Sequence, residues 1–106
     1  MERAVFVYTT YPSLVEAEKA GRAIVERRLA ACVNILGPCH SIYRWQDKIE
    51  EAVEVPVIFK TGADAAHALV ARLAELHSYD VPAAVVWPIA DAVPAYAQWV
   101  REEIGR

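Results

Sequence analysis

The side chains best suited to hold a soft metal ion are two cysteines and two of the three histidines. Cys39 and His40 directly follow a Gly-Pro pair, which is typical of an exposed turn, and they offer a thiolate beside an imidazole. Both groups are ligands for copper or zinc. Cys32 lies in an apolar run, where a thiol most often serves as a small core side chain. His77 follows a helical stretch, where it either caps the helix or faces a cleft.

These four residues do not have the paired short spacings of a structural zinc site. We therefore expect any metal site to be completed across subunits. The chain also has no glycine-rich phosphate loop, no H-E-x-x-H and no G-x-S-x-G motif. Cys32 with His77, as a thiol–imidazole pair of a hydrolase, is the minority alternative. The sequence favours a binding protein over an enzyme.

Other side chains are candidates for a small ligand. Lys60 ends a long alternating strand on the face opposite Phe59, so we expect it to point into an intersubunit groove and to bind an anion. The acidic residues of that strand are interpreted as a solvated face in preference to a hard-cation site. Trp45 is expected at a subunit interface, where aromatic residues are enriched. The ligand-binding candidates are Cys32, Trp45, Glu51, Lys60, Tyr79 and Asp80.

A βαββαβ order of elements must position these residues. Ser13 and Glu16 form a capping box that opens a helix ending near Leu29. Helical spacing of apolar residues also predicts a helix from Asp64 and a final one after Pro94. Extended patterns predict strands at 4–8, 31–35, 41–45, 49–60 and 83–87. This order predicts an α+β, ferredoxin-like sandwich with an extra C-terminal helix.

The strand at 49–60 is unusually long. A turn at 46–48 joins it to the preceding strand as a β-hairpin. Pro56 cannot donate a ladder hydrogen bond, so we expect a bulge or an edge position there. At about 3.3 Å per residue the hairpin is too long for a domain of this size to cover alone. Its far end is therefore predicted to lie on another subunit.

The composition fits one domain spanning residues 1–106. The apolar fraction is 56%, above the usual ~45–50% for soluble domains, and the excess indicates a subunit interface. The net charge of -3 has the wrong sign for nucleic acid or an anionic membrane. The first apolar run, at 4–8, is shorter than a signal-peptide core. We therefore expect a cytoplasmic protein, in which the two cysteines are free thiols or thiolate ligands and not a disulfide.

Five segments resemble the CutA divalent-cation-tolerance family, in that family's order and over nearly the whole chain. The resemblance implies a ferredoxin-like homotrimer with interlocking hairpins, similar to the PII signalling proteins, and a link to copper tolerance and metal binding. Copper-binding proposals for the family use a cysteine in the first strand and paired histidines. The matching positions here are Thr9 and Leu76-His77, so His77 alone agrees. The segments are Ala31-Cys32-Val33-Asn34-Ile35, Ser41-Ile42-Tyr43-Arg44-Trp45, Lys48-Ile49-Glu50-Glu51, Lys60-Thr61 and Leu76-His77-Ser78-Tyr79-Asp80-Val81-Pro82.

The sequence favours two functions. The first is a trimer linked to divalent cation tolerance that binds copper, another divalent metal or another small ligand in intersubunit clefts. Its metal candidates are Cys32, Cys39, His40 and His77. The second is a PII-like signalling or scaffold trimer that binds a small anionic ligand and reports it to a partner protein. The net negative charge of the chain argues against an RNA-binding module.

Overall fold

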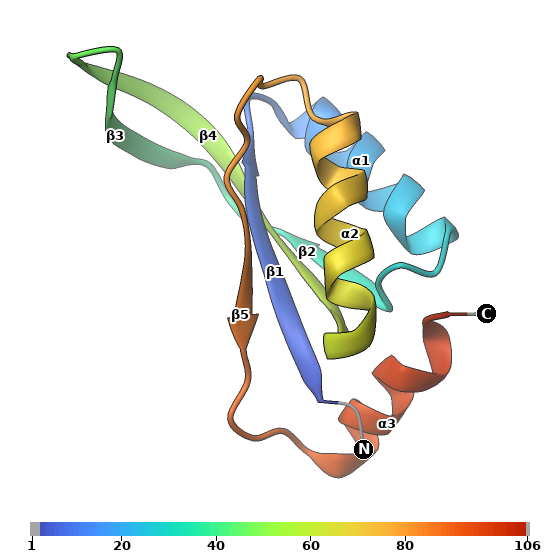
Figure 1. The fold of residues 1–106 in the computed structure, drawn as a ribbon. Coiled ribbons are helices and arrows are strands. Elements are labelled where there is room, and N and C mark those ends of the chain that lie inside the picture. Colours follow the sequence, from blue (N-terminus) through green and yellow to red (C-terminus); the bar gives the residue numbers. More distant parts are fainter. Residues whose placement is uncertain (1–2, 106) are drawn as a thin grey trace.

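The computed structural model describes residues 3–105, and the predicted strands and helices follow one another in the predicted order along the chain (Figure 1). The full order is βαβββαβα, because the second strand of the βαββαβ unit is divided into two. Within this range no helix is long and apolar enough to cross a membrane. The strands are β1 (Ala4–Tyr11), β2 (Cys32–Ile35), β3 (Cys39–Trp45), β4 (Lys48–Gly62) and β5 (Ala84–Pro88). The helices are α1 (Leu14–Glu26), α2 (Ala63–Leu76) and α3 (Pro94–Glu103).

The five strands form an antiparallel sheet in the order β2-β4-β1-β5, with β3 paired to the outer half of β4. Helices α1 and α2 lie side by side on one face of this sheet, and α3 lies near the start of β1 (Figure 1). This is the α+β, ferredoxin-like arrangement predicted from the sequence.

The core lies between the sheet and the two helices α1 and α2. Side chains on a strand alternate between faces, so every second residue of β1 and β4 turns toward the helices. Val7, Val57 and Phe59 have no exposed surface, and neither do Ile24 of α1 and Leu69 of α2. The same register places a second set on the opposite face, which α1 and α2 leave uncovered and which we call the open face. It consists of Phe6, Tyr8, Thr10, Cys32, Asn34, Glu54, Pro56, Ile58, Lys60, Val85 and Trp87.

Helix α1 differs from the prediction at both ends. The Ser13 hydroxyl accepts the N–H of Glu16 at 3.2 Å, as a capping residue should. The reciprocal half of the capping box is absent, because the Glu16 carboxylate binds Ser78 instead. The helix ends at Glu26 rather than near Leu29, because Arg28 takes a left-handed conformation (φ 59°) that helix geometry excludes.

Pro56 lies inside the sheet, paired with Thr10 of β1, and not at an edge. The predicted bulge lies in the segment between β2 and β3, which faces β4. There, the three residues from Leu36 to Pro38 lie opposite the two residues Val55 and Pro56. The Pro56 carbonyl accepts the N–H of Leu36 at 2.9 Å, so its missing N–H points toward this irregular segment. The proline therefore removes no hydrogen bond from a regular ladder.

The β3–β4 hairpin projects beyond the rest of the fold (Figure 1). Its turn is formed by Gln46 and Asp47, both at positive φ (50° and 64°), which matches the right-handed twist of the strands. Its two faces carry exposed apolar side chains: Ile42, Tyr43, Trp45, Ile49 and Val53. The isolated chain does not bury this arm.

Candidate functional site

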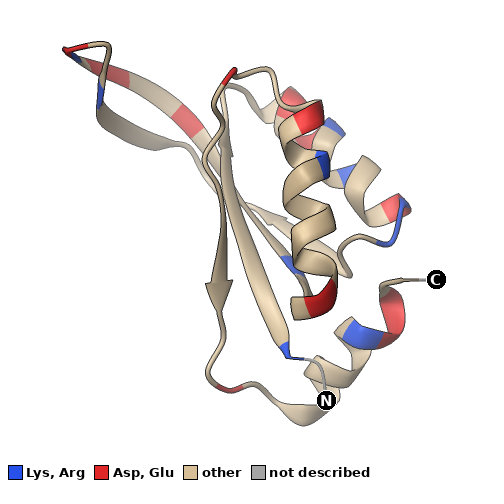
Figure 2. Cartoon of the chain, in the orientation of Figure 1, with Lys and Arg blue, Asp and Glu red and all other residues tan. Residues whose placement is uncertain are grey.

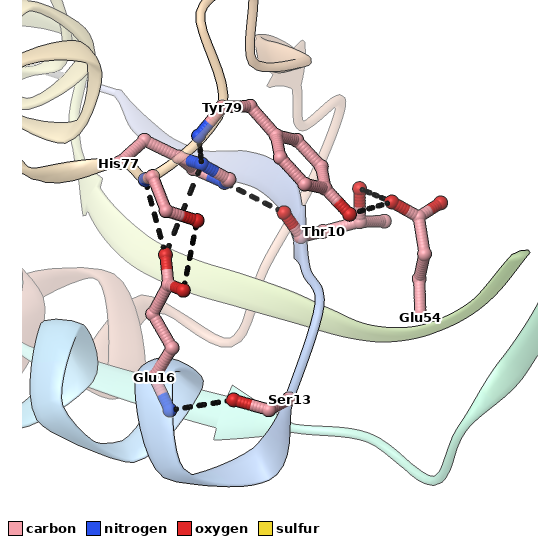
Figure 3. Close-up of polar contacts among 7 residues, drawn as sticks. Thr10, Ser13, Glu16, Glu54, His77 and Tyr79 are labelled. Carbon is pink, nitrogen blue, oxygen red and sulfur yellow. Dashed lines mark hydrogen bonds and ion pairs between the residues drawn. The ribbon is translucent and has the colours of Figure 1, made fainter.

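A polar cluster connects β1, α1, β4 and the loop after α2 (Figure 3). The Tyr79 hydroxyl donates to the Glu54 carboxylate at 2.8 Å, and the Thr10 hydroxyl donates to the same oxygen at 3.3 Å. On the helix side, the Glu16 carboxylate accepts both the N–H and the hydroxyl of Ser78, at 3.2 and 2.8 Å. We call Thr10, Glu16, Glu54, His77 and Tyr79 the Glu54 cluster.

His77 is buried within this cluster. It is 8% exposed, and its ring stacks on Tyr11 with centroids 4.4 Å apart. Nε2 lies 2.7 Å from the Thr10 carbonyl, so it donates, while Nδ1 accepts the N–H of Tyr79 at 3.1 Å. These partners assign the Nε2–H tautomer of a neutral imidazole. Both nitrogens are engaged within the chain, so a metal ion at His77 has to displace one of these hydrogen bonds.

The sequence candidates do not include Glu54, because the sequence predicts that the acidic residues of β4 form a solvent-exposed face. That interpretation is wrong for Glu54, which is 9% exposed. The alternation of the strand places it on the open face, but a loop 25 residues later in the chain covers it. The only sequence feature that could have indicated its burial is its position two residues before Pro56, in the part of β4 that lies within the sheet.

Glu54 changes the acidity of the phenols around it. The pKa of Tyr79 is raised to about 12, first by partial burial and then by the hydrogen bond and charge of Glu54. Burial also raises the pKa of Tyr8, with smaller effects from Cys39 and Glu54. Both phenols are therefore neutral at physiological pH, and Tyr79 donates its proton to the hydrogen bond with Glu54.

A second group of candidates lies on the open face, farther along β4. Cys32 is opposite Lys60 in the β2–β4 register, and its Sγ lies 3.9 Å from the hydroxyl of Tyr96 on α3. The Lys60 ammonium donates to the Asn34 side chain and sits 5.1 Å from the centre of the Phe6 ring. Burial, followed by the hydrogen bond with Cys32, raises the pKa of Tyr96 to about 12. Cys32 and Lys60, two of the predicted ligand residues, are thus brought together.

The structure does not bring Cys32 to His77 as a hydrolase pair would require. Cys32 faces Lys60 on β4, whereas His77 contacts Thr10, which faces Pro56. Four residues of extended strand separate these positions, about 13 Å. A thiol and an imidazole need hydrogen-bond contact to activate one another.

Cys39 and His40 lie in β3, so the predicted exposed turn is wrong at this point. They pair with Glu54 and Val53 of β4, because the hairpin ladder begins directly after the bulge. Adjacent strand residues point to opposite faces, so the thiol and the imidazole are separated. Cys39 Sγ lies 3.7 Å from the Ser41 hydroxyl, on the face of Glu54. His40 Nε2 lies 2.7 Å from Oε1 of Glu51, on the other face.

The remaining candidates stand apart from these groups. Trp45 is exposed beside the hairpin turn, and Asp80 is exposed in the loop after α2. Among residues 3–105, no three or more Cys, His, Asp and Glu side chains gather in a way that could hold a metal ion. The closest arrangement of two metal-binding types is His40 with Glu51.

The pattern of the CutA1 divalent ion tolerance protein family matches residues 5–103. The chain belongs to the CutA1 family. It is 43% identical over 105 residues to the divalent-cation tolerance protein CutA of Thermus thermophilus, covering 99% of this chain and 100% of that protein. It is 41% identical over 99 residues to the CutA protein of Pyrococcus horikoshii, covering 93% of this chain and 96% of that protein.

The crystal structure of CutA from Xylella fastidiosa has the same fold. It superposes on this chain with a TM-score of 0.94 at 38% identity, covering 97% of this chain and 99% of that chain. The family resemblance noted in the sequence is therefore confirmed, and with it the link to divalent cation tolerance.

Proposed function

We propose that this CutA1 chain works as a homotrimer that binds a divalent cation, with copper as the first candidate, at the boundary between subunits. The observation that carries the proposal is the contact of His40 Nε2 with Glu51 Oε1 at 2.7 Å on the projecting hairpin. Both side chains are about three-fifths exposed (61% and 60%), so an ion reaches them from solvent. Imidazole nitrogen with carboxylate oxygen is a donor pair that suits Cu²⁺ and Zn²⁺.

Two donors do not complete a coordination shell, because zinc sites have four protein ligands, or three with a water in the fourth position. The described part of the chain supplies no third donor to this pair. A neighbouring copy is the natural source, because the arm that carries His40 projects away from its own fold (Figure 1).

The exposed apolar side chains of the hairpin support assembly. Ile42 is 65% exposed and Val53 67%, on the same face as His40, while Trp45 on the other face is 48% exposed. Trp87 and Val85 on the open face of the sheet are also more than 40% exposed. Burying such surface against another copy is favourable by about 25 cal/mol per Å² of apolar area.

Calorimetric titration of the reduced protein with Cu²⁺, and separately with Zn²⁺, tests the proposal. His40→Ala and Glu51→Gln should each weaken binding at least about tenfold, or about 1.4 kcal/mol. His67→Ala is the matched control, because His67 is an exposed histidine on α2, away from the hairpin. Equal binding by all four proteins, or no saturable binding, would contradict the proposal.

A second candidate function, a PII-like trimer that binds a small anion, is favoured by one observation at Lys60. Its ammonium faces an amide and an aromatic ring, and no carboxylate of residues 3–105 pairs with it. An anionic ligand would supply the missing charge, and a partner protein would read the ligand-bound state. Titration with inorganic phosphate and with ATP should show binding that Lys60→Met removes and that Lys48→Met, at the exposed hairpin tip, keeps. Unchanged binding in Lys60→Met would exclude this function.

A further inference from the structure

Glu54 is a nearly buried acidic residue, and its hydrogen-bond partners among the described residues are two uncharged hydroxyl groups. The residue is 9% exposed, and an acidic residue at that depth is rare unless a positive charge accompanies it. In the part of the chain that the structure describes, every ion pair involves other carboxylates: those of Glu16, Glu51, Glu75 and Glu103. Among residues 3–105, therefore, no cationic side chain pairs with Glu54.

The hydrogen bonds of Glu54 leave room for that cation. Both hydroxyl donors, from Tyr79 and Thr10, bind Oε2. Oε1 accepts no hydrogen bond from the described residues. A carboxylate oxygen can accept two hydrogen bonds, so Oε1 retains its full capacity.

The direct neighbours of Glu54 on the open face are Cys39, Ala52 and Pro56. Tyr8 lies on the same face opposite Ile58, four residues along β4, and it stacks on Trp87 with ring centroids 4.8 Å apart and planes 12° apart. The charge of Glu54 contributes to the raised pKa of Tyr8, so the phenol reaches toward the carboxylate. Tyr79, from the loop after α2, places its hydroxyl on the carboxylate (Figure 3). Flat aromatic faces attract cations, and a guanidinium is the cation that both stacks on a ring and forks onto a carboxylate.

We propose that Glu54 is the binding site for a guanidinium group, which bonds Oε1 and packs on the Tyr8 face of the sheet. A metal ion fits this place less well, because the neighbouring phenols are neutral and three metal ligands do not gather there. The site is separate from the His40–Glu51 pair, which lies on the other face of the hairpin.

Two sources can supply this guanidinium. One is Arg44 of a second copy, because Arg44 is exposed near the hairpin tip and forms no ion pair with the described residues. Figure 2 shows basic positions together with an acidic one at the tip of the hairpin and further acidic positions along the hairpin toward its base, so the tip of one copy offers a cation to the acidic base of another. The other source is a free ligand with a guanidinium group. The first source rests on the proposed self-association, whereas the second does not.

A titration with methylguanidinium, followed by the NMR signals of the tyrosine rings, tests the site and its source. Arg44→Gln should bind the probe, and Glu54→Gln in the same background should lose it. Gln keeps the shape and accepts from Tyr79, so the loss reports charge. Glu50→Gln, which removes an exposed carboxylate from the same hairpin face, is the control and should bind normally. Should Glu54→Gln fail to fold, Glu54→Asp replaces it and should also weaken binding.

The wild-type chain distinguishes the two sources. If Arg44 of a second copy fills the site, wild type should bind methylguanidinium at least about tenfold more weakly than Arg44→Gln. If the ligand is free, both proteins should bind the probe equally. Binding that survives Glu54→Gln, or that Glu50→Gln lowers as much, overturns the proposal, as does the absence of binding in both wild type and Arg44→Gln. Copper binding by Glu54→Gln should stay normal, so failure here is distinguishable from failure of the cation site at His40.

Discussion

The hydroxyl of Tyr79 donates a 2.8 Å hydrogen bond to the buried carboxylate of Glu54, which joins the loop after α2 to the base of the hairpin. The N–H of the same tyrosine donates to Nδ1 of His77, whose Nε2–H donates to the Thr10 carbonyl. One loop is therefore attached to β1 and β4 by a continuous chain of hydrogen bonds. Loss of one member leaves a buried polar group without its partner, which is the costly outcome.

Tyr79→Phe should destabilise the protein by about 1–3 kcal/mol, because it removes a donor from a buried carboxylate. Denaturant unfolding at fixed protein concentration measures the change. Tyr43→Phe is the control: Tyr43 is 42% exposed on the hairpin, so its effect should stay within about 0.5 kcal/mol. Equal effects of the two substitutions would mean that the Tyr79–Glu54 bond contributes nothing to folding.

Alkaline pH should weaken the fold through its tyrosines. The pKa values of Tyr11, Tyr79 and Tyr96 are raised from 10.0 to about 12, with burial as the largest cause each time. A raised pKa means that the folded protein holds the phenol proton more tightly than the unfolded chain does. The resulting stability is complete below pH 10 and is lost as the pH rises toward 12. Ultraviolet titration of phenolate, with unfolding at each pH, should show late-titrating tyrosines; titration of all five near pH 10 would contradict this.

His77 should be a neutral imidazole with its proton on Nε2 at pH 8, since Nε2 donates to Thr10 and Nδ1 accepts from Tyr79. Nitrogen-15 NMR chemical shifts distinguish the two ring nitrogens directly. The exposed His67 provides the reference for an imidazole without these partners. A proton on Nδ1 of His77 would show that the hydrogen-bond assignment is wrong.

Oxidation should not join Cys32 to Cys39 within one chain. The two cysteines lie opposite Lys60 and Glu54 on β4, six residues apart, or about 20 Å of extended strand. A disulfide needs Cα atoms within about 7 Å. Non-reducing mass spectrometry after mild oxidation should find two thiols or links between chains, and an internal disulfide in folded protein would contradict the register.

The order of elements and the projecting hairpin were predictable from the sequence because they follow from local patterns. Alternating residues marked β4, and Ser13 marked the start of α1. The burial of Glu54 was not predictable, because it depends on a contact with Tyr79. The alternating pattern of β4 contains no information about that loop, which lies 25 residues later in the chain. The partners of His77 are likewise non-local, since Thr10 precedes it by 67 residues.

The position of Cys39 illustrates a different limit. The Gly-Pro pair before it is a turn signal, and the chain is indeed irregular from Leu36 to Pro38. The regular ladder resumes at Cys39, two residues before the predicted start of the strand at Ser41, and this register places Cys39 beside Glu54 and separates it from His40. Adjacent residues of a strand point to opposite faces, so two ligands that a turn could bring together are kept apart by a strand.

Native mass spectrometry of the protein with and without one equivalent of Cu²⁺ tests the central claim most directly. The account predicts an assembly of three 11.8 kDa chains that carries copper, with the copper lost in His40→Ala and retained in His67→Ala. A single chain as the main species would contradict the proposed assembly. A trimer that holds copper equally well without His40 would contradict the proposed site.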